Sequence, residues 1–264
     1  MAESILDRIV AAVSRRLEAM PEPADVSHQA GRAVAPRGRR SLAAALRSDG
    51  PSIIGECKKA SPSAGVLRAD FDPVKLARAY RAAGAAAISV VTEPDFFHGR
   101  PEWLTAVRDA VDLPVLRKDF IIDERQLRQA AVLGADAVLL IQRILPGDRL
   151  PRLVDAARAL ELEPLVEVFV DEDPSPAILA GAEIIGVNAR DLATFATRLD
   201  LVEAMAGRLP DTVVRVAESG ITGRDDIVRL AAAGYGGFLI GEHLVRAEDP
   251  ELALRRLLDA DVKS

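Results

Sequence analysis

Charged or strongly polar side chains stand directly after five apolar runs of this chain. The residues that share this position are Glu56 and Lys58, Lys118, Glu167, Asn188 and Arg190, and Glu218. Three carboxylates and two ammonium groups that meet in one place push one another's pKa values apart, and this separates proton donors from proton acceptors. We therefore expect general acid–base catalysis where these runs end. The alternative is a structural ion-pair network, which the cost of burying so many charges without a function disfavours.

The scarcity of lysine gives weight to two of these residues. Only five of the 34 Lys and Arg residues are lysines, yet Lys58 and Lys118 both follow apolar runs. An arginine stays charged under all ordinary conditions, whereas the pKa of a lysine moves when the side chain is buried. We therefore expect Lys58 and Lys118 to serve as proton donors or as compact ammonium groups.

Two glycine-containing segments suit a phosphate group. Ser219-Gly220 comes just after the fifth of these runs, and Gly241-Glu242 follows a further apolar run at 238–240. Backbone N–H groups beside glycine and at a helix N-terminus bind phosphate, and the loops after the seventh and eighth strands are the usual place for this in an α/β barrel. We expect Ser219, Gly220, Gly241 and the backbone of Glu242 to bind phosphate.

Three of the ten aromatic residues, Phe96, Phe97 and Phe120, stand just after the second and third strand patterns. Phe97 and Phe120 are expected to form an apolar wall for an aromatic ligand. Ordinary packing at the rim is an equal alternative for Phe96.

Eight strand patterns alternating with amphipathic helices would position these residues. The strands centre near Ile54, Ile88, Val115, Val138, Leu165, Ile185, Val214 and Phe238. Helices are predicted over 73–83, 124–133, 147–160, 224–233 and 250–258, and four of the connections contain a helix-ending glycine: Gly84, Gly134, Gly181 and Gly234. This pattern predicts an α/β fold, a (β/α)8 TIM barrel. An open doubly wound sheet is the alternative, but no Gly-rich dinucleotide turn follows the first strand.

The first 50 residues differ from the rest. A helix is predicted over about 3–20, followed by a stretch rich in Pro, Gly and Arg and a short helix over 41–47. We expect an N-terminal helical extension (1–50) packed on a barrel catalytic domain (51–264).

Composition excludes several classes of function. A net charge of -6 and a pI near 5.3 argue against nucleic-acid binding, and no apolar run approaches the roughly 20 residues of a membrane span. The chain has three histidines and a single cysteine, Cys57, which is expected to be buried, and this composition argues against a zinc site. One cysteine and a charged N-terminal segment without a signal pattern predict a cytoplasmic protein.

Five segments resemble the indole-3-glycerol-phosphate synthase family, in order and with similar spacing between about Ser52 and Leu258. They are Glu56-Cys57-Lys58-Lys59-Ala60-Ser61-Pro62-Ser63, Leu116-Arg117-Lys118-Asp119-Phe120, Leu165-Val166-Glu167-Val168, Gly186-Val187-Asn188-Ala189-Arg190 and Ala217-Glu218-Ser219-Gly220-Ile221. The resemblance implies a step of tryptophan biosynthesis. In it, a carboxyphenylamino-deoxyribulose phosphate closes its ring with loss of carbon dioxide and water, without metal or cofactor.

The same resemblance implies a role for each site residue. Lys118 is the general acid on the ketone, Lys58 contacts the substrate carboxylate, Glu167 is a second acid–base group, and Glu56 orients the lysines. Glu218 and Asn188 hold hydroxyls and the reacting amine, while Arg190 and Ser61 fix anionic groups.

Alternative functions remain open at this stage. One is an aldose–ketose isomerase acting on a phosphoribosyl amine; another is a non-catalytic phosphate-binding or scaffolding protein. A paralogue that performs the same reaction on a substituted substrate in specialised metabolism is a third. The expected partner is a small phosphorylated substrate, with no nucleic acid or membrane, and the chain is expected to be a monomer or a weak homo-oligomer.

Overall fold

The computed structural model describes residues 4–19, 38–190 and 196–259. In these residues, eight parallel strands close into one barrel in the order β1-β10-β9-β8-β7-β6-β5-β4, because β1 pairs with both β10 and β4. The strands are β1 (Ser52–Cys57), β4 (Ala87–Val91), β5 (Val115–Lys118), β6 (Ala137–Ile141), β7 (Glu163–Phe169), β8 (Ile184–Asn188), β9 (Val214–Glu218) and β10 (Gly237–Ile240). Each lies where the sequence predicts it, so the closed TIM barrel is confirmed and the open sheet is wrong.

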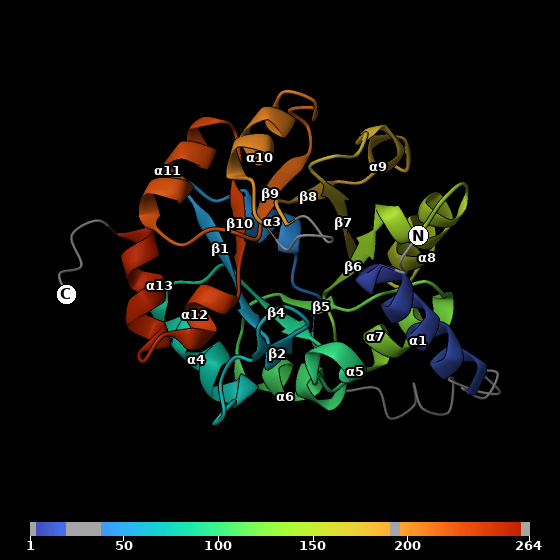
Figure 1. Ribbon diagram of the computed structural model, residues 1–264, viewed down its shortest axis with the longest axis horizontal. Coiled ribbons are helices and arrows are strands. Elements are labelled where there is room, and N and C mark those ends of the chain that lie inside the picture. The colour runs from blue at the N-terminus through green and yellow to red at the C-terminus, as the bar shows by residue number, and fades with distance from the viewer. Residues whose placement is uncertain (1–3, 20–37, 191–195, 260–264) are drawn as a thin grey trace.

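Helices surround the barrel and connect successive strands (Figure 1). They are α4 (Pro73–Ala83), α5 (Pro94–Phe97), α6 (Glu102–Ala110), α7 (Glu124–Val132), α8 (Arg149–Ala159), α9 (Ser175–Leu179), α10 (Leu199–Ala206), α11 (Arg224–Ala232), α12 (Glu242–Arg246) and α13 (Pro250–Leu258), with a 3-10 turn η1 at Gln142–Ile144. The predicted helices agree with these bounds to within about two residues. None of the helices in the described residues combines the length and the apolar character that crossing a bilayer requires.

Local sequence explains where the helices begin and end, as α4 illustrates. Asp72 caps its N-terminus by accepting hydrogen bonds from the backbone N–H groups of Val74 at 3.0 Å and Lys75 at 3.1 Å. Gly84 ends it with φ +97°, a left-handed conformation that glycine adopts at little cost. The other three predicted helix-ending glycines also have positive φ, which confirms the prediction.

The first βα connection contains a short antiparallel hairpin. Residues Ala60–Ser61 (β2) and Gly65–Val66 (β3) pair as a small antiparallel hairpin. Its turn contains Pro62, Ser63 and Ala64, whose N–H donates to Ser61 Oγ at 3.2 Å. Gly65 takes φ +64°, which a tight turn requires and glycine permits.

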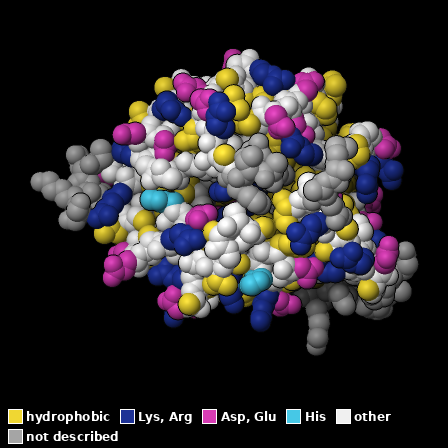
Figure 2. All heavy atoms as spheres, in the orientation of Figure 1, with side chains coloured by type: hydrophobic (Ala, Val, Ile, Leu, Met, Phe, Trp, Pro, Cys, Tyr) yellow, Lys and Arg dark blue, Asp and Glu magenta, His cyan; other side chains and the backbone are white. Residues whose placement is uncertain are grey.

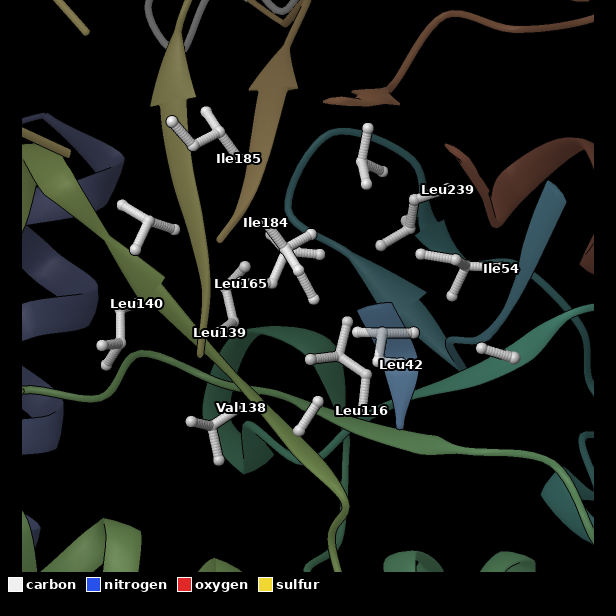
Figure 3. Close-up of a cluster of buried hydrophobic side chains, with 14 of the residues drawn as sticks. Leu42, Ile54, Leu116, Val138, Leu139, Leu140, Leu165, Ile184, Ile185 and Leu239 are labelled. Atoms are coloured by element: carbon white, nitrogen blue, oxygen red, sulfur yellow. The ribbon is translucent and has the colours of Figure 1, made fainter. Parts of the chain in front are cut away.

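The N-terminal end of the barrel is closed by α3 (Leu42–Leu46). Ser41, which caps this helix, donates from Oγ to Glu163 Oε1 at 2.6 Å, and the Ala43 N–H donates to Glu163 Oε2 at 2.8 Å. Because Glu163 begins β7, these bonds hold α3 at the start of the strands. Leu42 is fully buried and lies among the apolar side chains of the strands (Figure 3). The polar residues that follow the strands are therefore confined to the opposite, C-terminal mouth.

The first helix, α1 (Ile5–Ala19), packs on the body as its apolar spacing predicts. Its buried side chains are Leu6, Ile9, Ala12, Val13 and Leu17. Arg16 pairs with Asp95 of α5, and Arg125 of α7 donates to the Leu17 carbonyl at 2.9 Å. These contacts place α1 beside α5 and α7 (Figure 1).

Candidate active site

A cavity opens at the C-terminal mouth of the barrel. The charged and polar residues that line it are Glu56, Lys58, Ser61, Ser63, Lys118, Asp119, Glu167, Asn188, Arg190, Glu218, Ser219 and Glu242. They lie at or just after the C-terminal ends of β1, β5, β7, β8, β9 and β10, so the ends of the five apolar runs converge as the sequence predicts, joined by the end of β10. Around this region, positive and negative side chains are interspersed over the visible surface (Figure 2).

Lys118 lies at the centre of the charged cluster. Its Nζ is 3.0 Å from Glu167 Oε2 and 3.1 Å from Glu218 Oε2, and its side chain is only 16 % exposed. Burial alone acts to lower the pKa of Lys118, but Glu167, Glu218 and Glu56 outweigh it and raise this pKa above its ordinary value. The ammonium group therefore stays protonated when no ligand is bound.

Lys58 forms the second ion pair, with its Nζ 2.8 Å from Glu56 Oε1. Side chains alternate along β1, so both residues face the cavity and Cys57 faces the helices, where its thiol donates to the Pro73 carbonyl at 3.6 Å. Burial raises the pKa of the Cys57 thiol, which keeps it unreactive. Burial also opposes ionisation of Glu56, but Lys58 and Lys118 lower its pKa below the ordinary value. Both lysines thus act on one carboxylate at one mouth.

Glu218 differs from the other carboxylates. Burial raises its pKa to about 8, against the opposing effect of Lys118 and with the help of the Glu167 charge. Among the described residues its Oε1 has no hydrogen-bond partner. A Cβ on Gly186 of β8 would overlap this oxygen, so glycine is needed there to admit the carboxylate. Glu218 therefore carries a proton for much of the time near neutral pH.

Asn188 and Arg190 extend the polar wall beyond β8. Asn188 Oδ1 accepts the backbone N–H of Arg190 at 3.0 Å, and both side chains line the cavity. Arg190 also pairs with Thr197 through an isolated antiparallel bridge. The bridge fixes where the chain leaves and returns on either side of residues 191–195, which lie outside the described residues.

Two of the three rim phenylalanines form one wall of the cavity. The ring centroids of Phe97 and Phe120 are 5.9 Å apart and their planes are inclined by 37°. Phe96 instead packs toward α1, with the Arg8 guanidinium 5.7 Å from its ring centroid. The packing alternative therefore holds for Phe96.

A second hollow adjoins the cavity at the ends of β9 and β10. Its lining includes Ser219, Gly220, Gly241 and Glu242, together with Lys58, Arg190 and His243. Ser219 and Gly220 both have positive φ, +66° and +78°. A Cβ on Gly220 would lie 2.8 Å from Thr197 Cβ, so a residue without a side chain is needed at this point of the lining. All four residues predicted to bind phosphate are thus brought together beside two cationic side chains.

Sequence reasoning missed the contribution of α1 to the cavity. Ile5, Leu6 and Ile9 line it, and Leu139, Ile141, Phe169 and Leu239 supply an apolar lining from the strands. The apolar spacing of α1 signals a buried face but not which surface that face covers. The inward-facing positions of β6 and β10 could have been found from strand alternation. No cluster of His, Cys, Asp or Glu suited to a metal occurs in the described part of the chain.

Comparisons with known proteins agree with the resemblance. The family model described as "Indole-3-glycerol phosphate synthase" matches residues 6–257. The protein of that name from Carboxydothermus hydrogenoformans is 53% identical over 207 residues, 78% of each chain. Its namesake from Mycobacterium avium is 44% identical over 98% of this chain and 93% of its own, and that from Geobacillus kaustophilus is 43% identical over 96% of both.

Solved structures with distant sequences share the barrel. A 3-hexulose-6-phosphate synthase superposes with a TM-score of 0.63 at 19% identity, covering 78% of this chain and 97% of its own. A thiamine phosphate pyrophosphorylase from Pyrococcus furiosus gives 0.60 at 18% identity, covering 82% and 96%. At these identities the likeness concerns the fold alone.

Proposed function

Because the chain belongs to the indole-3-glycerol phosphate synthase family, we propose that it converts 1-(2-carboxyphenylamino)-1-deoxyribulose 5-phosphate into indole-3-glycerol phosphate. The reaction releases carbon dioxide and water, which makes the enzyme a carbon–carbon lyase of the carboxy-lyase class. One observation carries the proposal: Lys118 Nζ lies 3.0 and 3.1 Å from two buried carboxylates in the same cavity as Lys58, Phe97 and Phe120.

Ring closure is the step that needs an acid. The ring carbon that bears the carboxylate bonds to the ketone carbon of the sugar, and the ketone oxygen gains a proton. The Lys118 ammonium is the donor, because it stays charged and lies between carboxylates that can return a proton to it. Breaking the bond to the carboxylate then releases carbon dioxide and restores the aromatic ring.

Dehydration completes the reaction. The hydroxyl formed in the first step leaves as water after protonation, and a proton departs from the neighbouring sugar carbon to give the indole. Glu167 is suited to this acid–base work because its Oε2 already contacts Lys118 Nζ. Glu218, with a pKa of about 8, can hold a proton at neutral pH and assist at the hydroxyl.

The remaining site residues would bind the substrate. Phe97 and Phe120 offer an apolar wall to the anthranilate ring. Glu56 would hold Lys58 toward the carboxylate, and Asn188, Arg190 and Ser61 would bind further polar groups around it. The phosphate would occupy the adjoining hollow at Ser219, Gly220, Gly241 and Glu242.

The isomerase alternative has less support. That reaction would need a Cys or Asp base at the end of the first strand. Glu56 and Lys58 occupy the inward positions there, and the Cys57 thiol faces Pro73 on the other side. A non-catalytic scaffold would have no need to bury Glu167 and Glu218 around Lys118.

The experiment that tests the proposal mixes the purified protein with the carboxyphenylamino sugar phosphate and follows indole fluorescence. We expect turnover with and without added EDTA, because acid–base groups of the protein supply the chemistry. Loss of activity with EDTA would contradict the cofactor-free mechanism. Absence of fluorescence in both arms, with substrate unchanged by mass, would overturn the function. A series of ring-substituted substrates would separate a specialised paralogue from the biosynthetic enzyme by their kcat/KM values.

A further inference from the structure

Two buried charged residues flank Lys118 along the chain. Arg117 and Asp119 are 3 % and 6 % exposed, and Arg117 Nη2 lies 2.9 Å from Asp119 Oδ2. Alternation along β5 directs Lys118 into the barrel and Arg117 toward the surrounding helices. A buried arginine without partners costs several kcal/mol, so the contacts that satisfy Arg117 constrain its place strongly.

Thr92, which follows β4 and is fully buried, joins this pair. Its Oγ1 accepts from Arg117 Nε at 3.2 Å and donates to Asp119 Oδ2 at 2.6 Å. Its backbone N–H donates to the Lys118 carbonyl at 3.1 Å. The end of β4 therefore holds the backbone of Lys118 and both of its neighbours.

The loop after β5 is held by the same network. Asp119 Oδ1 accepts the backbone N–H of Phe120 at 2.8 Å. Gln126 Nε2 donates to the Phe120 carbonyl at 2.9 Å, and Gln126 Oε1 accepts the backbone N–H of Ile122 at 2.9 Å. Arg117 Nη1 in turn donates to the Gln126 carbonyl at 3.0 Å. Both oxygens of Asp119 are thus engaged by the protein, although this residue borders the cavity.

We propose that Arg117, Asp119 and Thr92 are positioning residues: they fix the backbone of Lys118 and thereby the distances from its Nζ to the carboxylates of Glu167 and Glu218. The inference rests on the proposed function, since it concerns the same proton transfer. A lysine side chain has four rotatable bonds, so a fixed backbone is required to keep Nζ within 3.0 and 3.1 Å of two carboxylates on other strands. A displacement of about 1 Å in a reacting group lowers a rate by on the order of 100-fold.

A second buried pair, Arg108 of α6 and Asp136 just before β6, binds the start of β5 and provides a matched control. Arg108 Nη2 lies 3.2 Å from Asp136 Oδ1, and the two side chains are 6% and 0% exposed. Asp136 Oδ2 accepts the backbone N–H of Val115, the first residue of β5, at 2.9 Å. This pair therefore holds the opposite end of the strand by the same chemistry, away from the cavity.

The experiment compares Asp119→Asn and Asp136→Asn with the wild type by thermal unfolding and by steady-state kinetics over a range of pH. We expect both variants to lower Tm, but only Asp119→Asn to lower kcat, by about 10- to 100-fold. Its KM should change less than about 3-fold, since the binding residues are intact. The shape of the kcat–pH profile should be preserved, because Asp119 does not itself transfer a proton.

Thr92 gives an independent variant in case Asp119→Asn fails to fold. Thr92→Val keeps the shape but removes the hydroxyl, so it should lower kcat by about 10-fold, while Thr92→Ser should restore it. The inference is overturned if wild-type protein turns over substrate and kcat in Asp119→Asn and Thr92→Val stays within about 2-fold of it. It is also overturned if Asp136→Asn loses kcat to the same extent. An inactive wild type would instead refute the proposed function, and the inference with it.

Discussion

Lys118 and Glu167 place opposite charges 3.0 Å apart across the barrel mouth, on strands β5 and β7, which are separated by β6. A contact of this kind depends on barrel closure, because neither local sequence nor strand pairing brings the two residues together. Glu218 of β9 completes the cluster at 3.1 Å from the same nitrogen. One ammonium group therefore links three alternate strands.

Replacing this lysine should stop the reaction without unfolding the protein. We expect Lys118→Met to lower kcat by on the order of 1,000-fold or more, because it removes the proton donor from the ring-closing step. Far-UV circular dichroism should remain that of the wild type. Lys75→Met, at a side chain 84% exposed on α4, is the matched control and should keep full activity. Near-normal turnover by Lys118→Met would remove this residue from the mechanism.

The raised pKa of Glu218 predicts a pH-dependent stability. Its folded-state pKa of about 8 exceeds the ordinary value of 4.5, so the protonated form is favoured by folding. Stability from this group is present below the ordinary pKa and is lost as pH rises through about 8, by at most about 1.4 kcal/mol per unit. Glu218→Gln cannot ionise, so the wild-type Tm should fall relative to that of the variant between about pH 4.5 and 8 and change little above that.

Thermal unfolding of both proteins across this range checks the prediction. Glu248→Gln, at an exposed position, is the control and should follow the wild type at every pH. If the Tm curves of the wild type and Glu218→Gln ran parallel over this pH range, Glu218 would not be protonated at neutral pH in the folded protein.

Much of the barrel was predictable because its signals are local. Apolar runs mark the strands, and Gly84 or Gly134 ends a helix by a conformation that other residues avoid. The position of Glu167 in the site follows from these local signals as well. Once the strands are parallel and the sheet is closed, a residue at a strand's C-terminal end must face the mouth.

Other features depend on contacts between segments that are distant in the sequence, and such contacts cannot be predicted from the local pattern of one sequence. The apolar face of α1 predicts packing, but the surface that it covers depends on contacts with distant segments, such as the ion pair to α5 and the bond from Arg125, and these place Ile5 at the cavity. The network around Arg117 likewise requires Thr92 to come from the neighbouring strand. Residues 20–37, predicted as an irregular Pro, Gly and Arg-rich stretch, lie outside the described residues.

The ion pair between α1 and α5 should affect substrate binding. Arg16 Nη2 donates to Oε1 of Glu93, the residue that caps α5, at 3.0 Å, and the buried Glu93 carboxylate also accepts the backbone N–H of Phe97 at 3.2 Å. The side chain of Arg16 is 35% exposed, so solvent screening limits the pair to about 1 kcal/mol. Arg16→Met should therefore raise KM by about 5-fold with a smaller change in kcat. Steady-state kinetics beside Arg15→Met, its exposed neighbour, test this, and an unchanged KM would contradict it.

Gly220 should be needed for binding the phosphate. An alanine there would have to hold φ near +78° with its Cβ 2.8 Å from Thr197 Cβ, and such strain costs about 1–3 kcal/mol. Relief of the strain would move the backbone that lines the hollow, so Gly220→Ala should raise KM by about 5- to 100-fold. Gly223→Ala is the matched control, since its φ of -152° suits any residue and no atom lies within 4 Å of the added Cβ.

Binding of indole-3-glycerol, which lacks the phosphate, should be the same in both variants. Equal weakening of the phosphorylated and unphosphorylated ligands by Gly220→Ala would place the phosphate elsewhere.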